Sequence, residues 1–485
     1  MRADRGVLMA RALTADRSKL PEPGPARTFK FPPVEKSVLP SGLRVWTVRH
    51  PQVPVVSLIL LVTRGAAADP PGQDGLAAIT ADMLDEGSGG RSAIQMHEAL
   101  ARLGAQFDTD IGSDATAISV TALSRVTDRV LPLVGDIVAR PSLGESDFER
   151  VRQLRLHRLK QLRDSPAAVA DRAFLSLVYG DDPYGHSPIG NEASLTSLTI
   201  DDVRSFHGRE LVPAAATLIA VGDCDHSAMA RLAAHAFADW GEDHGRRTQR
   251  PAPASRDQGR TTHQAPNTKG QAPSAPPRLA VVPRLRAPQS ELRIGQVAAA
   301  RHTPDYHALA LANAILGGQF VSRVNLNLRE DKGFTYGART AFEFRRRPGP
   351  FVLQVSVQTA ATVQAIHESL AEIEGIRGTR PVTPEELSFG VAALTRGYAR
   401  NFETADQIGR AVMQLALYDL PDDYYAQFVP RIEAVSRDEV SRVMTRYIDP
   451  ARLTTLIVGD IDVFGAELGG LGVGDPLVLP PDAFS

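Results

Sequence analysis

The stretch Leu195–Asp225, LTSLTIDDVRSFHGRELVPAAATLIAVGDCD, occurs twice in related form in this chain of 485 residues. The second copy is Ile432–Asp462, IEAVSRDEVSRVMTRYIDPARLTTLIVGDID, and the two copies align without gaps. Each copy predicts a short helix after Thr or Ser, a turn that contains proline, an apolar strand and a Gly-Asp turn. The copies lie much further apart than the roughly 20–50 residues of solenoid repeats, which indicates a duplicated whole domain. The identical pairs include Asp201 and Asp438, Val203 and Val440, Pro213 and Pro450, and Gly222-Asp223 and Gly459-Asp460.

A segment of unusual composition, residues 244–278, separates the two halves. It contains no Leu, Ile, Val, Phe, Met, Trp or Tyr and is dense in Pro, Gln, Thr and Ser. Such a segment buries too little apolar surface to offset the entropy of ordering it, so we predict a linker. A long ordered surface loop is the alternative. The predicted organisation is a tail at 1–36, an N-terminal domain at 37–243, the linker at 244–278, a C-terminal domain at 279–475 and a tail at 476–485.

Strand and helix patterns alternate within each half. Leu43–Val48 and Phe351–Gln358 alternate at period two, which is typical of strands. Apolar residues recur at helical spacing in the segments 148–162 and 309–316. We therefore predict an α+β fold of two homologous α/β sandwich domains, each a sheet with helices on one side, that could face each other across a cavity.

Composition excludes several classes of function. The chain has 54 basic and 56 acidic side chains, so no net charge attracts it to nucleic acid or to an anionic membrane. Its single cysteine, Cys224, excludes an intrachain disulfide and a zinc site built from several thiolates. The longest apolar run, Val53–Val62, is much shorter than the about 20 residues of a membrane helix. The N-terminal apolar stretch is broken by Arg11, so we expect a cytoplasmic protein, or a periplasmic one if the true start or signal is missing.

Several common catalytic motifs do not occur in the sequence. It has no G-x-x-x-x-G-K-[ST] phosphate loop and no G-x-S-x-G nucleophile elbow. No two of the 12 histidines lie four residues apart, as paired zinc ligands on one helix do.

Two other stretches carry a family resemblance. Gly75–Ser88 reads GLAAITADMLDEGS, and Asn325–Ala338 reads NLNLREDKGFTYGA. Together with the duplication, they resemble the insulinase, pitrilysin and mitochondrial-processing-peptidase family of zinc peptidases, from about Val38 to about Gly465. The resemblance implies that the two homologous domains form a clamshell around a peptide. It also implies an inverted zinc motif, His-x-x-Glu-His, on the first helix of the active half and a glutamate ligand on a later helix.

The positions that correspond to the zinc motif have lost their ligands. They are Ala78, Ala81 and Asp82, and alanine offers no lone pair to a metal. The helix expected to carry the glutamate ligand, Asp147–Arg163, has Glu149 as its only glutamate, near its start, and many Arg and Lys residues that repel a dication. A catalytic zinc ion keeps three protein ligands, and this chain offers at most one. We predict no metal site in this chain and no hydrolysis by the chain alone.

The second stretch keeps its functional residue types. Arg329 and Tyr336 have the spacing of the arginine and tyrosine that contact substrate in the family. A guanidinium can bind a peptide carbonyl or carboxylate through two donors, and a phenol can donate to a developing oxyanion. The alternative is an exposed charged turn, Arg329–Gly333, followed by a strand tyrosine.

The resemblance therefore favours the non-zinc-binding subunit of a heterodimeric zinc metallopeptidase. In this hypothesis the chain needs no cofactor of its own, and its partner is a homologous subunit that holds the zinc. The chain supplies Arg329, Tyr336 and part of the peptide chamber. Two alternatives remain open: a non-enzymatic peptide-binding or scaffold subunit, and an autonomous peptidase with unusual ligands.

Overall fold

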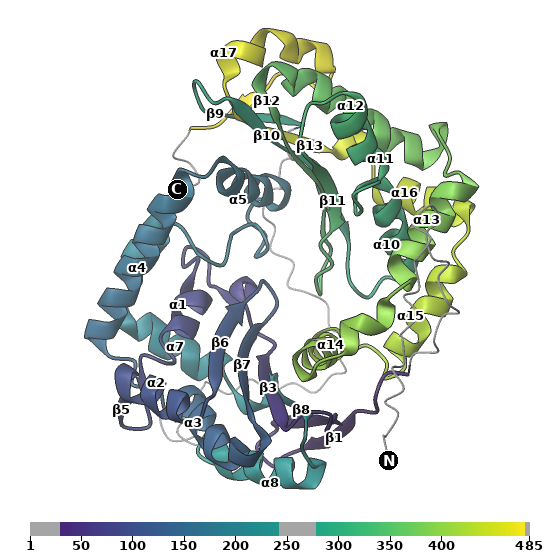
Figure 1. Cartoon of the computed structure of the whole chain (residues 1–485). Helices are drawn as coiled ribbons and strands as arrows, with labels where there is room; N and C mark the ends of the chain where they lie inside the picture. Colours follow the sequence, from purple (N-terminus) through teal and green to yellow (C-terminus); the bar gives the residue numbers. More distant parts are fainter. Residues whose placement is uncertain (1–29, 242–277, 481–485) are drawn as a thin grey trace, which may run out of the picture. The chain divides into compact units, whose positions relative to one another are not determined.

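The computed structural model of the chain describes residues 30–241 and 278–480 (Figure 1). The predicted linker, except Arg278, and the predicted N-terminal tail up to residue 29 lie outside the described residues. The described residues from Phe31 onward belong to one compact unit. None of the helices in the described ranges is both long enough and apolar enough to cross a bilayer.

Two six-stranded sheets form the framework. Their strand orders are β1-β2-β8-β3-β7-β6 and β11-β12-β10-β13-β9-β14. The first sheet contains β1 (Glu35–Val38), β2 (Arg44–Arg49), β3 (Val55–Val62), β6 (Gln106–Ile111), β7 (Thr116–Leu123) and β8 (Ala216–Gly222). The second contains β9 (Leu279–Pro283), β10 (Gln289–Ala299), β11 (Ala338–Phe342), β12 (Gly349–Gln358), β13 (Thr454–Gly459) and β14 (Leu477–Val478). A small hairpin joins β4 (Gly87–Ser88) and β5 (Arg91–Ser92).

The two sheets repeat one topology. In the first, β2 runs parallel to β8, and β8, β3, β7 and β6 then pair in antiparallel fashion. In the second, β9 runs parallel to β13, and β13, β10, β12 and β11 follow in the same way. The duplicated α/β architecture predicted from the sequence is confirmed. The sixth strands differ, because β1 is antiparallel to β2 whereas β14 is parallel to β9 and comes from within the predicted C-terminal tail.

The duplicated sequence folds in the same way in both halves. Helix α7 (Ile200–Glu210) leads through a 3₁₀ turn into β8, and helix α16 (Arg437–Tyr447) leads through another into β13. The side chains of Thr199 and Ser436 each cap their helix in a capping box, which satisfies backbone N–H groups at the helix start. The predicted order of helix, proline turn and strand is therefore confirmed.

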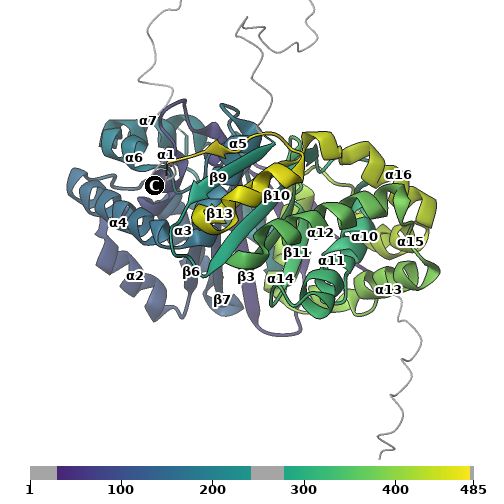
Figure 2. The ribbon, with the colours of Figure 1, turned by 90° about the horizontal axis from the view of Figure 1, so that it is seen from above.

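The remaining helices flank the sheets, and Figure 2 shows them from above. The other helices of the first half are α1 (Leu76–Asp82), α2 (Ala93–Arg102), α3 (Thr127–Ala139), α4 (Glu145–Arg163), α5 (Pro166–Tyr179), α6 (Glu192–Ser197) and α8 (His226–Ala236). Those of the second half are α10 (Tyr306–Leu316), α11 (Arg323–Asn325), α12 (Thr362–Glu374), α13 (Pro384–Thr395), α14 (Ala405–Leu417), α15 (Tyr424–Glu433) and α17 (Ile461–Phe464). Short 3₁₀ or π-helical turns are η1 (Ala66–Ala68), η2 (Ser124–Val126), η3 (Pro213–Ala215), η4 (Leu326–Asp331), η5 (Thr359–Ala361), η6 (Gly375–Thr379), η7 (Tyr398–Phe402), η8 (Pro450–Arg452) and η9 (Gly465–Leu471).

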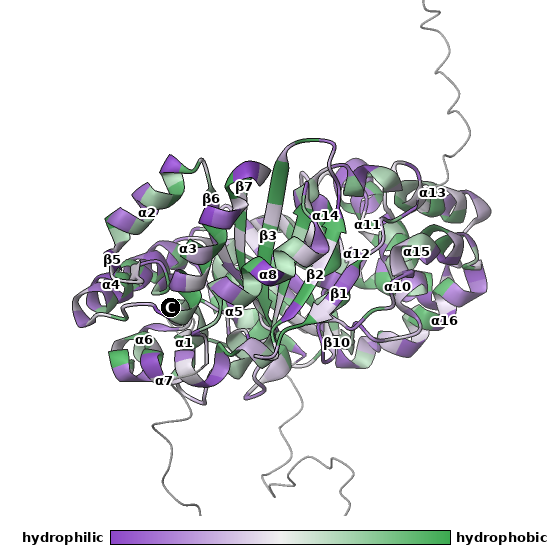
Figure 3. Ribbon diagram, turned by 90° about the horizontal axis from the view of Figure 1, so that it is seen from below, coloured by the Kyte–Doolittle hydropathy of each residue, from purple (hydrophilic) through white to green (hydrophobic). Residues whose placement is uncertain are grey.

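Each half lends one helix to the sheet of the other half. Helix α5 packs on β10 and β13, and helix α14 packs on β3 and β8. The central strands are buried on both faces, and Figure 3 shows β3 as largely hydrophobic. The prediction of helices on one side of each sheet was therefore incomplete, because a helix from the other half covers the second face. A continuous apolar run such as Val55–Val62 is typical of a strand that is covered on both sides.

The contact between α5 and the second sheet is apolar at its centre and charged at its edge. Phe174 is 3% exposed and belongs to an apolar cluster with residues of β9, β12 and β13. Beside it, Arg293 of β10 donates through Nε to Asp171 Oδ1 of α5 at 2.7 Å.

Replacing Phe174 with alanine tests this contact. Loss of a buried phenylalanine costs about 3–5 kcal/mol, so Phe174→Ala is expected to lower the unfolding temperature clearly. Phe389→Ala is the matched control, because Phe389 is 44% exposed, and it is expected to change stability by less than about 1 kcal/mol. Thermal unfolding followed by circular dichroism measures both, and equal small effects would contradict the packing.

Candidate functional site

Helix α1 carries Ala78, Ala81 and Asp82, the positions that the resemblance assigns to the zinc motif, and a buried carboxylate fixes the start of this helix. Asp69 accepts hydrogen bonds at 2.7 Å from the backbone N–H groups of Gly75 and Ala77. Gly75 has φ of +92°, a conformation that favours glycine. The His186 ring bonds Asp69 through Nε2 at 3.1 Å, and Asp74 lies 4.0 Å from its Nδ1. Burial alone would lower the pKa of His186, but the hydrogen bond to Asp69 and the charge of Asp74 outweigh it and raise the pKa above its ordinary value.

Of these three positions, Ala78 and Ala81 are buried, and Asp82 forms an ion pair. Ala78 and Ala81 are 1% and 3% exposed and pack into the interior. Asp82 is exposed, and its Oδ2 accepts a hydrogen bond of 2.7 Å from Arg155 Nε on α4. The helix predicted to carry a glutamate ligand thus presents a guanidinium to α1.

The residues at this place do not fit a zinc ion. Ala78 and Ala81 have no donor atom for a metal, and Asp82 is already paired with the Arg155 guanidinium. Within residues 30–241 and 278–480, no group of three or more His, Cys, Asp or Glu side chains is placed to hold a metal. A zinc ion needs three protein ligands and would lie beside the positive charge of Arg155, which repels it.

A cavity of about 530 Å³ lies at the same place. Strand β6 borders it and is the edge strand of the first sheet. The outer edge of β6 makes no backbone hydrogen bond within the described chain apart from its pairing with β7. The lining residues are Ala81, Asp82, Asp85, Glu86, His97, Phe107, Asp108, Thr109, Val151, Leu154, Arg155, Arg158 and Ile189.

Further ion pairs line this cavity. His97 Nε2 lies 3.4 Å from Asp85 Oδ2, and Glu86 pairs with Arg150. Burial raises the pKa of Asp85, against the opposing charge of His97. Asp82, Asp85 and Glu86 of the cavity wall are therefore each paired with a basic side chain and are not free to bind a metal.

Arg329 and Tyr336 lie on the C-terminal half, in η4 and in the loop before β11. The Arg329 guanidinium stacks 3.4 Å from the centroid of the Phe320 ring, and its Nε donates to Glu330 Oε1 at 2.9 Å. Tyr336 is 94% exposed, and its hydroxyl has no hydrogen-bond partner among the described residues. Within the described ranges, Arg329 and Tyr336 make no hydrogen bond or ion pair with Ala78, Ala81 or Asp82 and do not line the cavity beside α1.

Sequence reasoning missed three residues around these positions. Arg155 is the partner of Asp82, Phe320 supports Arg329, and Asn325 pins the start of β11 through both its amide atoms. Asn325 stands in the stretch that carried the resemblance, so its place in that motif was a signal. No sequence pattern pairs Arg155 with a residue 73 positions away.

Comparisons with known proteins agree with the duplicated fold. The model of the insulinase family, peptidase family M16, matches residues 44–192, and the model of the peptidase M16 inactive domain matches residues 197–394. The chain belongs to peptidase family M16. The inactive-domain match begins after α1 and therefore does not bear on the metal-ligand positions Ala78, Ala81 and Asp82.

Individual M16 relatives are distant but extend over most of the chain. An uncharacterized zinc protease of Mycobacterium leprae is 24% identical over 79% of this chain and 83% of the relative. One of Streptomyces coelicolor is 25% identical over 88% of this chain and 90% of the relative. The crystal structure of a peptidase M16 inactive domain from Pseudomonas fluorescens has a TM-score of 0.77 at 22% identity, covering 88% of this chain and 98% of that one. A protease from Helicobacter pylori has a TM-score of 0.75 at 18% identity, covering 88% and 99%. These two structures support the fold alone.

The zinc content of the purified chain tests the reading of α1. After equilibration with zinc and removal of free metal, elemental analysis is expected to find well below one zinc ion per chain, because the donor set is incomplete. Asp82→Asn is expected to leave that value unchanged. Stoichiometric zinc that falls on Asp82→Asn would contradict the reading.

The pH dependence of stability tests the link between His186 and Asp69. Because the pKa of His186 is raised in the folded chain, the stabilisation is full below the unfolded pKa of about 6.5 and is lost as pH rises through the folded pKa. The stability difference between the native chain and His186→Gln should therefore shrink from pH 6 to pH 9. Denaturation at several pH values measures it, with His302→Gln at an exposed position as control. A difference that grows with pH would contradict the assignment.

Proposed function

We propose that this chain is the zinc-free subunit of a two-chain M16 peptidase. The observation that carries the proposal is the ion pair between Asp82 and Arg155, where the family's resemblance places a metal motif. Since Ala78 and Ala81 offer no donors, the chain cannot activate water through a zinc ion of its own. A homologous partner that keeps His-x-x-Glu-His would supply the metal.

The C-terminal half gives this chain something to contribute to a partner. The Tyr336 hydroxyl is exposed and available to donate a hydrogen bond to a peptide carbonyl on which negative charge develops. Arg329 is held in one place by the Phe320 ring and by Glu330, which limits the entropy it would lose on binding. In the proposed complex both side chains would act on a peptide held near the partner's zinc ion.

The N-terminal half keeps the means to hold an extended peptide. Strand β6 has a free edge that borders the cavity at α1. An extended peptide can add to such an edge through backbone hydrogen bonds. Loss of the metal ligands on α1 has left this edge in place.

A non-enzymatic peptide-binding or scaffold subunit is the second candidate. The ion pair between Arg329 and Glu330 favours this candidate, because the Arg329 guanidinium must break that pair before it can bind a substrate carboxylate or carbonyl. It shares the peptide-binding edge with the first candidate and differs only in whether cleavage follows.

Reconstitution distinguishes the two candidates. Peptide cleavage would be measured for this chain alone, for a homologue that retains His-x-x-Glu-His alone, and for their mixture. The proposal expects cleavage chiefly in the mixture. Tyr336→Phe should reduce the kcat of the mixture on the order of a hundredfold, the typical effect of removing an oxyanion donor.

The control is Tyr447→Phe, which removes a hydroxyl group that is hydrogen-bonded to Thr303 and Asp305. It is expected to leave cleavage by the mixture unchanged. Cleavage by the homologue that does not respond to this chain, or to Tyr336→Phe, would favour the scaffold role.

A further inference from the structure

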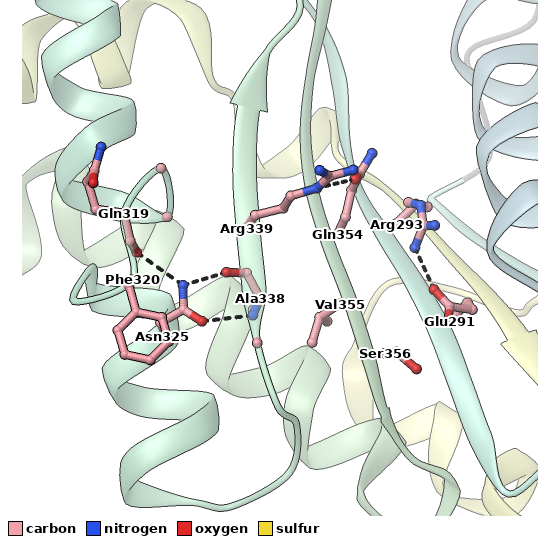
Figure 4. A pocket seen from close by; sticks show the side chains of 13 residues that line it. Glu291, Arg293, Gln319, Phe320, Asn325, Ala338, Arg339, Gln354, Val355 and Ser356 are labelled. Carbon is pink, nitrogen blue, oxygen red and sulfur yellow. Dashed lines mark hydrogen bonds and ion pairs between the residues drawn. The ribbon is translucent and has the colours of Figure 1, made fainter. Parts of the chain in front are cut away.

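A second cavity, of about 480 Å³, lies between the second sheet and the turn after α10 (Figure 4). Gly337 and Ala338, which follow Tyr336, form part of its wall, and so does Phe320, on which Arg329 stacks. Figure 4 shows Phe320 and Asn325 on one side, Arg293 with Glu291 on the other, and Arg339 with Gln354 between them.

The small residues of the wall keep this cavity open and its shape fixed. A Cβ on Gly317 would lie 2.6 Å from Thr340 Oγ1, so the turn and β11 approach closely only with glycine there. The Asn325 side chain donates to Ala338 O at 2.5 Å and accepts from Ala338 N at 2.9 Å. The wall is therefore held by hydrogen bonds before any ligand arrives.

Two of the three charged side chains in the lining, Arg293 and Glu291, pair with each other. Arg293 is 4% exposed and donates to Asp171, to Glu291 Oε2 at 3.0 Å and to two backbone carbonyl groups. The same contacts occupy Glu291 and connect α5 with the sheet. These groups serve the fold and leave little for a ligand.

Arg339 is the exception. Its Nε donates to the neutral Gln354 Oε1 at 2.7 Å, which directs the guanidinium along the cavity wall. In the part of the chain that the structure describes, no carboxylate pairs with Arg339, and its two terminal nitrogens make no hydrogen bond. An oriented guanidinium with two free donors matches the two oxygens of a carboxylate.

We propose that this cavity is a specificity subsite for a carboxylate of the bound peptide, which Arg339 recognises. The inference rests on the proposed function for the presence of a peptide beside Tyr336. Phe320 and Val355 offer apolar contact for the stem of an acidic residue. The carboxylate belongs either to an Asp or Glu side chain or to the C-terminus of the peptide.

Binding to the chain alone tests the subsite without any cleavage. The probes are fluorescein-labelled peptides of one Ala- and Leu-based sequence that differ at one internal position and at the C-terminus. One carries Glu with an amidated end, one Gln with an amidated end, and one Gln with a free carboxylate. Fluorescence anisotropy gives the Kd of each.

The Glu peptide or the free-carboxylate peptide is expected to bind about tenfold more tightly than the amidated Gln peptide, as a charge-assisted hydrogen bond allows. The tighter of the two identifies the source of the carboxylate. Arg339→Gln should remove the difference, and Arg339→Lys should keep part of it. Gln354→Glu should also remove it, because the new carboxylate would occupy Arg339.

Arg396→Gln is the matched control. Arg396 is an exposed arginine of the same half without a recorded side-chain partner in the described chain, and its loss should leave the preference intact. Equal affinity for the three peptides, no binding by any, or a preference that survives Arg339→Gln would overturn the subsite. Proteolysis by the reconstituted mixture reports separately on the proposed function, so the two can fail independently.

Discussion

The hydrogen-bonded ion pair between Asp82 and Arg155 governs what the first half of this molecule can do. It joins α1 and α4 at the place where the family resemblance calls for a metal and its ligands. With Asp82 45% and Arg155 13% exposed at the side chain, the pair stabilises the fold by only about 1 kcal/mol or less. The pair matters less for folding stability than for metal binding, because the fixed positive charge of Arg155 repels a divalent cation from the same space.

Buried apolar side chains hold the framework around this pair. Leu76, Ile79, Met83 and Leu84 remain buried, so replacing ligands by Ala78 and Ala81 keeps α1 packed. The exchange of α5 and α14 between the halves ties the two sheets together through buried side chains such as Phe174. Helix α1 therefore packs without metal donors, and the cavity wall and the edge strand β6 beside it stay in place.

Much of the fold followed from the sequence because local patterns carried it. The gapless duplication predicted the two equivalent units of helix, turn and strand, and the capping residues Thr199 and Ser436 marked where their helices begin. The exchange of α5 and α14 was not predicted, because periodicity shows that a face is buried but not which element covers it. The run Val55–Val62 indicated that both faces of this strand are covered, since it is apolar on both faces, but not that α14 covers one of them.

The candidate sites show the same division. The missing donors at Ala78 and Ala81 were visible in the sequence, because an absent lone pair needs no structure to establish. The sequence did not show that Asp82 pairs with Arg155, or that Arg339 bonds Gln354 and no carboxylate of the described residues. Both facts depend on which side chains tertiary packing brings together.

Diffraction from crystals soaked in zinc, with data collected at the zinc absorption edge, tests the central claim most directly. We expect no anomalous peak between α1 and α4, and Arg155 still within hydrogen-bonding distance of Asp82. A peak beside Asp82 with three protein donors around it, and Arg155 displaced, would contradict the account.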